Sequence, residues 1–210
     1  MPKLSNSAVI LLIALGLMVQ GFRPKPNPKP LKANLLGIDS ITLKSINSNN
    51  FQLKQFPNTK GFIVVFTCNH CPFAQMYSTR LNAIYQQYAS QQVALIAVNS
   101  MDTLMYAEES FQLMQAKAKQ DKFQFPYLQD ADQRFGRAFN AEHTPQVFVL
   151  WKDSSAYNIR YQGSIDDNGQ DSAQVNNHYL ETAVDALLKN EVVKVPFTES
   201  FGCRIFYRKP

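Results

Sequence analysis

The feature that most constrains this 210-residue chain is a pair of cysteines, Cys68 and Cys71, directly after an apolar run. The run, residues 61–67, is rich in β-branched and aromatic residues and begins with glycine, which predicts a buried strand. Residues 73–89 repeat their apolar side chains at helical spacing. The cysteines therefore lie where a central strand passes into a helix N-terminus. That place favours a thiolate, because unpaired N–H groups and the helix dipole stabilise an anion there.

Strands and helices alternate along the rest of the chain. Further strands are predicted at 92–98, 125–128, 146–151 and 157–161, with short strands within 36–53 around a turn at 47–50. Further helices are predicted at 106–119, 130–139 and 172–189, and an extended tail at 195–210. Alternating strands and helices that end in a hairpin give a mixed sheet. We therefore expect an α/β fold of three layers, a mixed central sheet flanked by helices.

The net charge of +5 does not indicate a nucleic-acid surface. Five basic residues and no acidic ones precede Asp39, and without those five the chain has 16 basic and 16 acidic residues. The basicity belongs to the N-terminal region, so we expect no nucleic-acid partner.

The N-terminal region has the features of an export signal. Lys3 precedes an apolar stretch at 8–19, which as a helix is about 18 Å long, shorter than the roughly 30 Å of a bilayer core. We interpret 1–21 as a signal peptide or an uncleaved anchor, 22–35 as a stiff Pro/Lys-rich linker, and 36–210 as the folded domain. This predicts a periplasmic protein, in contact with a membrane only if the leader is retained.

Three sequence motifs carry a resemblance to a known family. They are Phe66-Thr-Cys-Asn-His-Cys-Pro72, Phe125-Pro-Tyr-Leu-Gln-Asp130 and Phe201-Gly-Cys203, with Thr144-Pro145 opening a strand pair. Residues 36–207 resemble the redoxin branch of the thioredoxin superfamily, which includes TlpA-like and AhpC/TSA-related proteins. The resemblance implies a thioredoxin-like fold with a βα insertion before a cis-proline.

The resemblance also implies roles for individual residues. Cys68 would be the attacking cysteine and Cys71 the resolving one. Pro145 would be the cis-proline that faces the disulfide, and the Thr144 backbone would hydrogen-bond a bound substrate strand. The implied partners are protein thiols or disulfides and a redox partner protein, and the implied redox group is the disulfide itself, with no other cofactor.

The sequence departs from the family pattern at positions near the cysteines. Thr67 replaces the tryptophan that usually precedes the first cysteine, and Phe62 and Ala74 occupy the places where a buried acid is expected. Proton transfer to or from Cys71 would then use His70, His143 or water. A protonated His70 would favour the Cys68 thiolate and make the disulfide more oxidising.

Each candidate also has a structural interpretation. The cysteine pair would be a structural bridge or half of a zinc site, but a bridge over two residues constrains the chain little and no second ligand pair exists. His70 and His143 would be solvated polar residues. Cys203 is either a small buried apolar residue or a third redox thiol, near Cys68 or exposed to a partner.

Two other functions remain open. A thiol peroxidase of the AhpC/TSA type needs a threonine three residues before its reactive cysteine, where this chain has Val65 or Cys68. A copper-binding chaperone similar to the Sco group would use both cysteines with His143 or His178, although that group spaces its cysteines by three residues. The direction of electron flow and the oligomeric state are not determined by the sequence.

Overall fold

A computed structural model describes residues 33–47, 49–154 and 156–209. The leader at 1–21 and residues 22–32 of the linker lie outside the described residues, so their roles stay predictions. Residues 33–35 contact the domain: the Asn34 N–H donates to the Ala138 carbonyl, and Leu35 packs against the core. Within the described part of the chain, no helix has the length and apolar character needed to span a membrane.

The strands and helices follow the predicted order closely. The strands are β1 (Leu43–Ser45), β2 (Asn50–Phe51), β3 (Gly61–Phe66), β4 (Val93–Asn99), β5 (Tyr127–Gln129), β6 (His143–Thr144), β7 (Gln146–Asp153), β8 (Ala156–Gly163) and β9 (Cys203–Arg204). The α-helices are α1 (Pro72–Gln75), α2 (Ser78–Ala89), α3 (Phe111–Gln120), α4 (Arg134–Phe139) and α5 (Tyr179–Leu188). Short 3-10 helices are η1 (Ile38–Ser40), η2 (Leu53–Gln55), η3 (Ala107–Glu109) and η4 (Ser172–Gln174).

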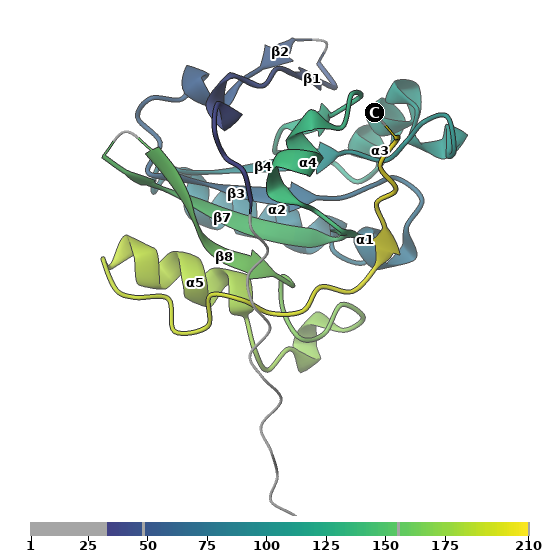
Figure 1. The fold of residues 1–210 in the computed structure, drawn as a ribbon. Helices are drawn as coiled ribbons and strands as arrows, with labels where there is room; N and C mark the ends of the chain where they lie inside the picture. Colours follow the sequence, from purple (N-terminus) through teal and green to yellow (C-terminus); the bar gives the residue numbers. More distant parts are fainter. Residues whose placement is uncertain (1–32, 48, 155, 210) are drawn as a thin grey trace, which may run out of the picture.

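Among the described residues, seven strands form one mixed sheet in the order β2-β1-β5-β4-β3-β7-β8 (Figure 1). β3 lies inside it, parallel to β4 and antiparallel to β7, and β4 is parallel to β5. β6 and β9 pair separately, in antiparallel orientation. The predicted α/β fold with a mixed central sheet is confirmed.

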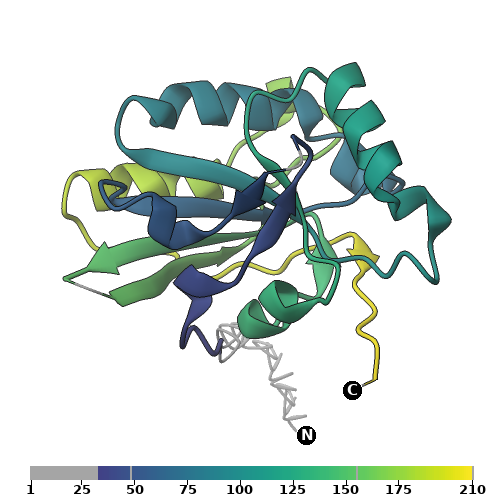
Figure 2. The same ribbon diagram turned by 90° about the horizontal axis from the view of Figure 1, so that it is seen from above.

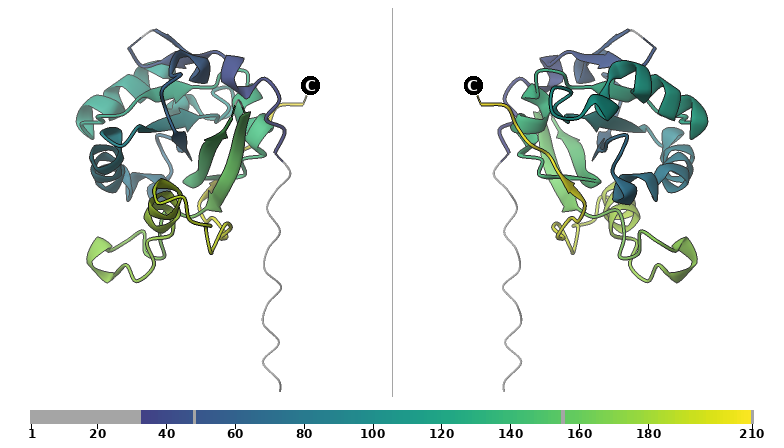
Figure 3. Two further views of the ribbon diagram at one scale, coloured as in Figure 1. Left: turned by 90° about the vertical axis from the view of Figure 1, so that its left-hand side faces the viewer. Right: turned by 90° about the vertical axis from the view of Figure 1, so that its right-hand side faces the viewer.

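Successive side chains of β3 point to opposite faces of the sheet and so contribute to two separate parts of the core. Ile63 and Val65 face the side covered by α2, α3 and α5, whereas Phe62, Val64 and Phe66 face the side covered by α4 and the N-terminal 3-10 helices. Figure 2 shows α2 and α4 on opposite sides of the sheet, and Figure 3 shows α5 on the same side as α2. Every residue of β3 is buried, as expected for a strand covered on both faces.

The helices differ from the prediction at their N-terminal ends. The helix expected at 73–89 is broken between α1 and α2 at Tyr77, whose buried side chain donates a hydrogen bond from its hydroxyl to Asp166, 2.9 Å away. Phe73 and Met76, two of the apolar residues at helical spacing in 73–89, are 51% and 40% exposed. The helices expected at 106–119 and 172–189 each begin with a separate 3-10 turn, η3 or η4, before the α-helix. Propensity alone does not reveal such breaks, because tertiary contacts set them.

Candidate redox site

The two cysteines lie at the carboxyl-terminal edge of the parallel strands. Cys68 follows β3 by two residues, and Cys71 is the N-cap of α1, with Pro72 at the first helical position. Proline suits that position because its missing N–H would have no helical partner. Both thiols are free and 0% exposed, so no partner reaches either sulfur directly in this conformation.

Thr144 contacts both sulfurs. Its carbonyl accepts a hydrogen bond from the Cys71 thiol at 3.1 Å, and its hydroxyl lies 3.1 Å from the Cys68 sulfur. The Thr144–Pro145 peptide bond is cis, as the resemblance implied. The structure therefore brings together four of the residues selected from the sequence, across more than 70 positions of chain.

The pKa values of the two thiols are shifted in opposite directions. The pKa of Cys71 lies well below its usual value, because the Cys68 thiol donates to its sulfur, as do the Cys203 thiol and the N–H groups of Ala74 and Cys203. Burial and the Thr144 carbonyl favour protonated Cys71, but these donors outweigh them. The pKa of Cys68 is raised by its hydrogen bond to Cys71, by burial and by the charge of Glu109. The lowered pKa favours a thiolate at Cys71 in the reduced protein, next to Cys68, which the resemblance implies as the attacking cysteine.

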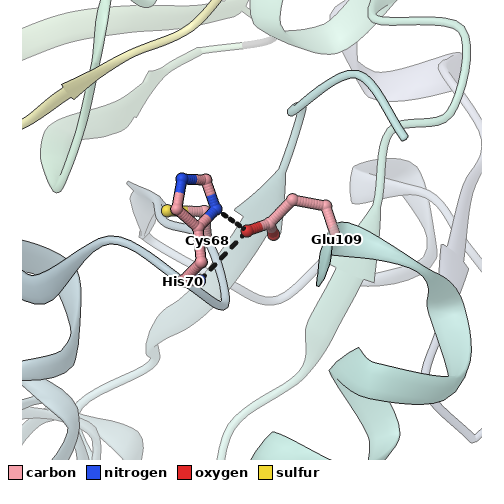
Figure 4. A group of neighbouring side chains, drawn as sticks. All are labelled: Cys68, His70 and Glu109. Carbon is pink, nitrogen blue, oxygen red and sulfur yellow. Dashed lines mark hydrogen bonds and ion pairs between the residues drawn. The ribbon is translucent and has the colours of Figure 1, made fainter. Parts of the chain in front are cut away.

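Glu109 is a buried carboxylate that holds the loop between the cysteines. It is 1% exposed and accepts hydrogen bonds from the backbone N–H of Asn69 (2.8 Å) and His70 (3.0 Å). The Asn99 amide donates to it at 2.5 Å, and His70 Nδ1 lies 2.5 Å from it (Figure 4). A buried acid is therefore present near the cysteines, which the sequence analysis did not find. It comes from η3 rather than from positions 62 or 74.

A second layer of polar groups supports this loop. The buried Tyr127 hydroxyl donates to the Asn69 side-chain oxygen at 2.9 Å and accepts from Asn99 at 3.3 Å. The Gln75 amide donates to the Asn69 carbonyl at 2.8 Å. Burial raises the pKa of Tyr127 well above its usual value, and the charge of Glu109 adds to this effect, so the hydroxyl stays a donor.

His70 is directed at Glu109 more than at the cysteines. Its ring stacks on Tyr106 with 5.1 Å between ring centroids, and Figure 4 shows its Nδ1 facing the Glu109 carboxylate. Candidate ligand atoms of Cys68, His70 and Glu109 lie within 4.8 Å of one another. The carboxylate oxygens already accept five contacts, from Asn69, His70 and Asn99. Four donor groups already bond to the carboxylate, so a metal ion at Glu109 would have to displace one of them.

The C-terminal segment covers the cysteines. β9 pairs with β6, which aligns Cys203 with Thr144 and Arg204 with His143. The Cys203 N–H donates to the Cys71 sulfur at 3.4 Å, and Figure 1 shows this strand beside α1. Cys203 is partly exposed, and its pKa is raised to about 12 by burial, by its hydrogen bond to Cys71 and by the charges of Cys71 and Glu109. Of the predicted places for Cys203, buried, folded back near Cys68 or exposed to a partner, the structure shows a partly exposed residue folded back against Cys71 and Thr144.

The other histidines lie outside this cluster of side chains. His143, in β6, has its Nδ1 3.4 Å from the Ser200 hydroxyl, at the edge of the site. His178 is the exposed N-cap residue of α5, and its Nδ1 lies 2.9 Å from the Glu181 carboxylate. Neither belongs to the group of candidate ligands formed by Cys68, His70 and Glu109.

The pKa shifts predict which cysteine carries the charge. We expect the ultraviolet absorbance of a thiolate in the reduced protein to persist at about pH 6, below the region near pH 8.5 where a free thiol ionises. The absorbance is lost only as the pH falls through the lowered pKa of Cys71. Cys71→Ser should abolish it, whereas Cys68→Ala should keep it with a higher pKa. Loss in the Cys68 variant alone would reverse the assignment.

Comparison with known proteins identifies several similar chains. The AhpC/TSA family matches residues 38–167. A hypothetical protein from Sinorhizobium meliloti 1021 is 32% identical, with a TM-score of 0.72 over 81% of this chain and 92% of that one. An uncharacterised conserved protein from Geobacillus kaustophilus is 28% identical, with a TM-score of 0.72 over 88% and 93%. Peroxiredoxin Q from Xanthomonas campestris shares the fold, at 13% identity and a TM-score of 0.50 over 76% and 94%. A search of curated proteins found no match.

Proposed function

The chain belongs to the AhpC/TSA family, and from that membership we propose that it is a thiol–disulfide oxidoreductase that exchanges a Cys68–Cys71 disulfide with protein thiols. The thioredoxin-superfamily resemblance is confirmed, and the chain is a thiol-based redox enzyme. The finer proposal rests on one observation: Thr144 lies 3.1 Å from the sulfurs of both Cys68 and Cys71, at the end of the buried central strand β3. Two cysteines separated by two residues and held against one threonine need only small movements to form a disulfide.

The reaction follows from the properties of the two thiols. In the reduced protein, Cys71 supplies a stabilised thiolate and Cys68 retains a proton. Exchange with a protein disulfide forms a mixed disulfide, which the second cysteine of the pair then breaks, so two electrons pass to the partner, whose two thiols receive the Cys68 proton and one proton from solvent. The reverse sequence oxidises a dithiol. We propose that the redox group is the Cys68–Cys71 disulfide itself, with no metal or organic cofactor.

The cellular location and the partners are proposed from the sequence and the chemistry. The apolar leader at 1–21 supports export, so the domain would act in the periplasm, free or anchored. Protein thiols or disulfides are the proposed substrates, and a second redox protein would regenerate the pair. Thr144, Pro145 and His143 are proposed to contact the substrate, because they lie along β6 and at its end, beside the sulfurs.

The test is a redox titration of the full-length protein, with the Cys68–Cys71 disulfide quantified by mass spectrometry. We expect a midpoint above the roughly −270 mV of thioredoxin, because the lowered pKa of Cys71 stabilises the reduced state. Cys71→Ser should form no such disulfide. If the wild-type pair stays reduced up to about −120 mV, the proposal fails.

Peroxidase activity is the alternative that the family favours. The threonine hydroxyl that contacts Cys68 belongs to Thr144, not to a residue three positions before the cysteine, which is the buried Val65. We therefore expect hydrogen peroxide to oxidise the reduced protein no faster than it oxidises an ordinary thiolate. Rapid, saturable peroxide consumption that is lost in Cys68→Ser would favour the peroxidase.

A further inference from the structure

We propose that Cys203 is a relay cysteine, which exchanges with the protein partner and passes the disulfide to Cys71. This inference rests on the proposed thiol–disulfide exchange and adds a third reacting sulfur to it. It explains how a buried pair can react with a protein, because Cys68 and Cys71 are 0% exposed whereas Cys203 is partly exposed.

The first argument concerns the place that Cys203 occupies. The Thr144 backbone, expected to bind a substrate strand, instead pairs with the chain's own β9 in antiparallel register. The segment that contains β9, residues 201–205, is here called the strap. Its Cys203 aligns with Thr144 directly beside the sulfurs, where the cysteine of a bound substrate strand would lie.

The second argument is that the strap packs unusually close to the Thr144 backbone. Gly202 has φ +152°, and a Cβ added there would lie 2.0 Å from the Thr144 carbonyl oxygen. Only glycine fits this approach without a shift of the backbone. The buried Ile205 anchors the other side of the cysteine, and its N–H donates to the Glu142 carbonyl at 2.8 Å. Cys203 is therefore held in place from both sides.

The third argument is that Cys71 is the central sulfur of the three. Its sulfur accepts the Cys203 N–H at 3.4 Å and, like the Cys68 sulfur, lies 3.1 Å from Thr144, so it can form a disulfide with either cysteine after a small movement. The lowered pKa of Cys71 also keeps it a thiolate, the form that attacks a Cys203–partner bond, and the Cys203 N–H holds it next to that bond.

The relay conserves atoms and electrons. With a reduced chain, Cys203 loses its proton to solvent and its thiolate attacks a partner disulfide, which forms a Cys203–partner bond and releases one partner thiolate. The Cys71 thiolate then attacks Cys203, forms a Cys71–Cys203 bond and releases the second partner sulfur as a thiolate. Finally Cys68 loses its proton, bonds to Cys71 and releases Cys203, which takes up a proton again. Two electrons pass to the partner, whose two thiolates are protonated by the Cys68 proton and one proton from solvent, and the chain ends with a Cys68–Cys71 disulfide.

Trapping tests the order of these steps in the full-length protein. Oxidised glutathione should convert Cys68→Ser to a Cys71–Cys203 disulfide, identified by mass spectrometry of unreduced peptides. Cys71→Ser is the matched control and should stop at a glutathione adduct on Cys203. An adduct that accumulates on Cys203 in the Cys68 variant, without a Cys71–Cys203 bond, would overturn the relay.

Kinetics separates the relay from the proposed function. Cys203→Ser should slow equilibration of the Cys68–Cys71 pair with glutathione by roughly tenfold or more, because the remaining route requires the strap to open first. The equilibrium midpoint should change little, since serine retains a hydroxyl donor toward Cys71. If Cys203→Ser equilibrates as fast as wild type, the relay is wrong while the oxidoreductase stands. If the wild-type Cys68–Cys71 pair forms no disulfide, both the relay and the proposed oxidoreductase function are wrong.

Discussion

Glu109→Ala is expected to lower the free energy of unfolding by about 4 kcal/mol, because each buried group that loses its partner costs about 1–3 kcal/mol. The substitution leaves the N–H groups of Asn69 and His70 and the amide of Asn99 without the carboxylate that now accepts from them. The loss is a large part of the roughly 5–15 kcal/mol that stabilises a typical domain. Chemical denaturation of the reduced protein, monitored by circular dichroism, measures it.

The neighbouring residue provides a matched control for this prediction. Glu108 is exposed, and only its backbone carbonyl contacts the loop, accepting from the Asn69 amide at 2.8 Å. Glu108→Ala should therefore change stability by less than about 0.5 kcal/mol, as for most surface substitutions. Equal losses in the two variants would mean that the buried carboxylate does not hold the loop.

A conservative variant separates positioning from charge. Glu109→Gln keeps one acceptor oxygen and removes a charge that raises the pKa of Cys68. Because a negative charge disfavours thiolates, its removal stabilises the reduced state, and the midpoint potential should rise. A purely structural role would lower stability without moving the potential.

Local sequence patterns predicted which strand and helix hold the cysteines, but not the Glu109 and Cys203 segments that pack against them. The apolar run before Cys68 and the alternation of strands and helices placed the cysteines correctly at the edge of a mixed sheet. The cis bond at Pro145 came from the family resemblance, since most X–Pro bonds are trans.

Glu109 was missed because its role depends on segments that meet only in the fold. Its partners come from the loop after β3 and from the end of β4. A signal existed at Asn99, a polar residue at the carboxyl end of a strand beside the one that carries the cysteines. Ligand and reaction sites in α/β sheets gather at this edge. Nothing local indicated that an acid ten residues further along would return to it.

Cys203 could not be placed because the tail has no periodic pattern that predicts a partner. The glycine immediately before it was the available signal, since a glycine beside a reactive residue is typical of a close backbone approach. Only the register of β9 against β6 identifies the approach as one onto Thr144.

Gly202→Ala should release the strap and expose the buried thiols. The added Cβ would lie 2.0 Å from the Thr144 carbonyl oxygen. The backbone at this position also has φ +152°, which residues with a side chain rarely adopt. If the substitution destabilises the closed strap relative to the open one by about 2 kcal/mol, the fraction of molecules with an open strap rises about 30-fold. In a Cys203→Ser background, where only Cys68 and Cys71 react, labelling by an aromatic disulfide reagent should accelerate by that factor. Gly37→Ala is the control, since Gly37 also has positive φ but no atom lies within 4 Å of its added Cβ.

Combining the two substitutions decides between a relay and a simple cover. If Cys203 is the relay, Cys203→Ser slows glutathione exchange when Gly202 is present but by less than about twofold once Gly202→Ala has opened a direct route to Cys71. The two effects are then strongly non-additive. A strap that only covers the site predicts that Gly202→Ala accelerates exchange equally with cysteine or serine at 203. Additive rate effects in this double-mutant cycle would therefore exclude the relay, while a large coupling would establish Cys203 as part of the reaction path.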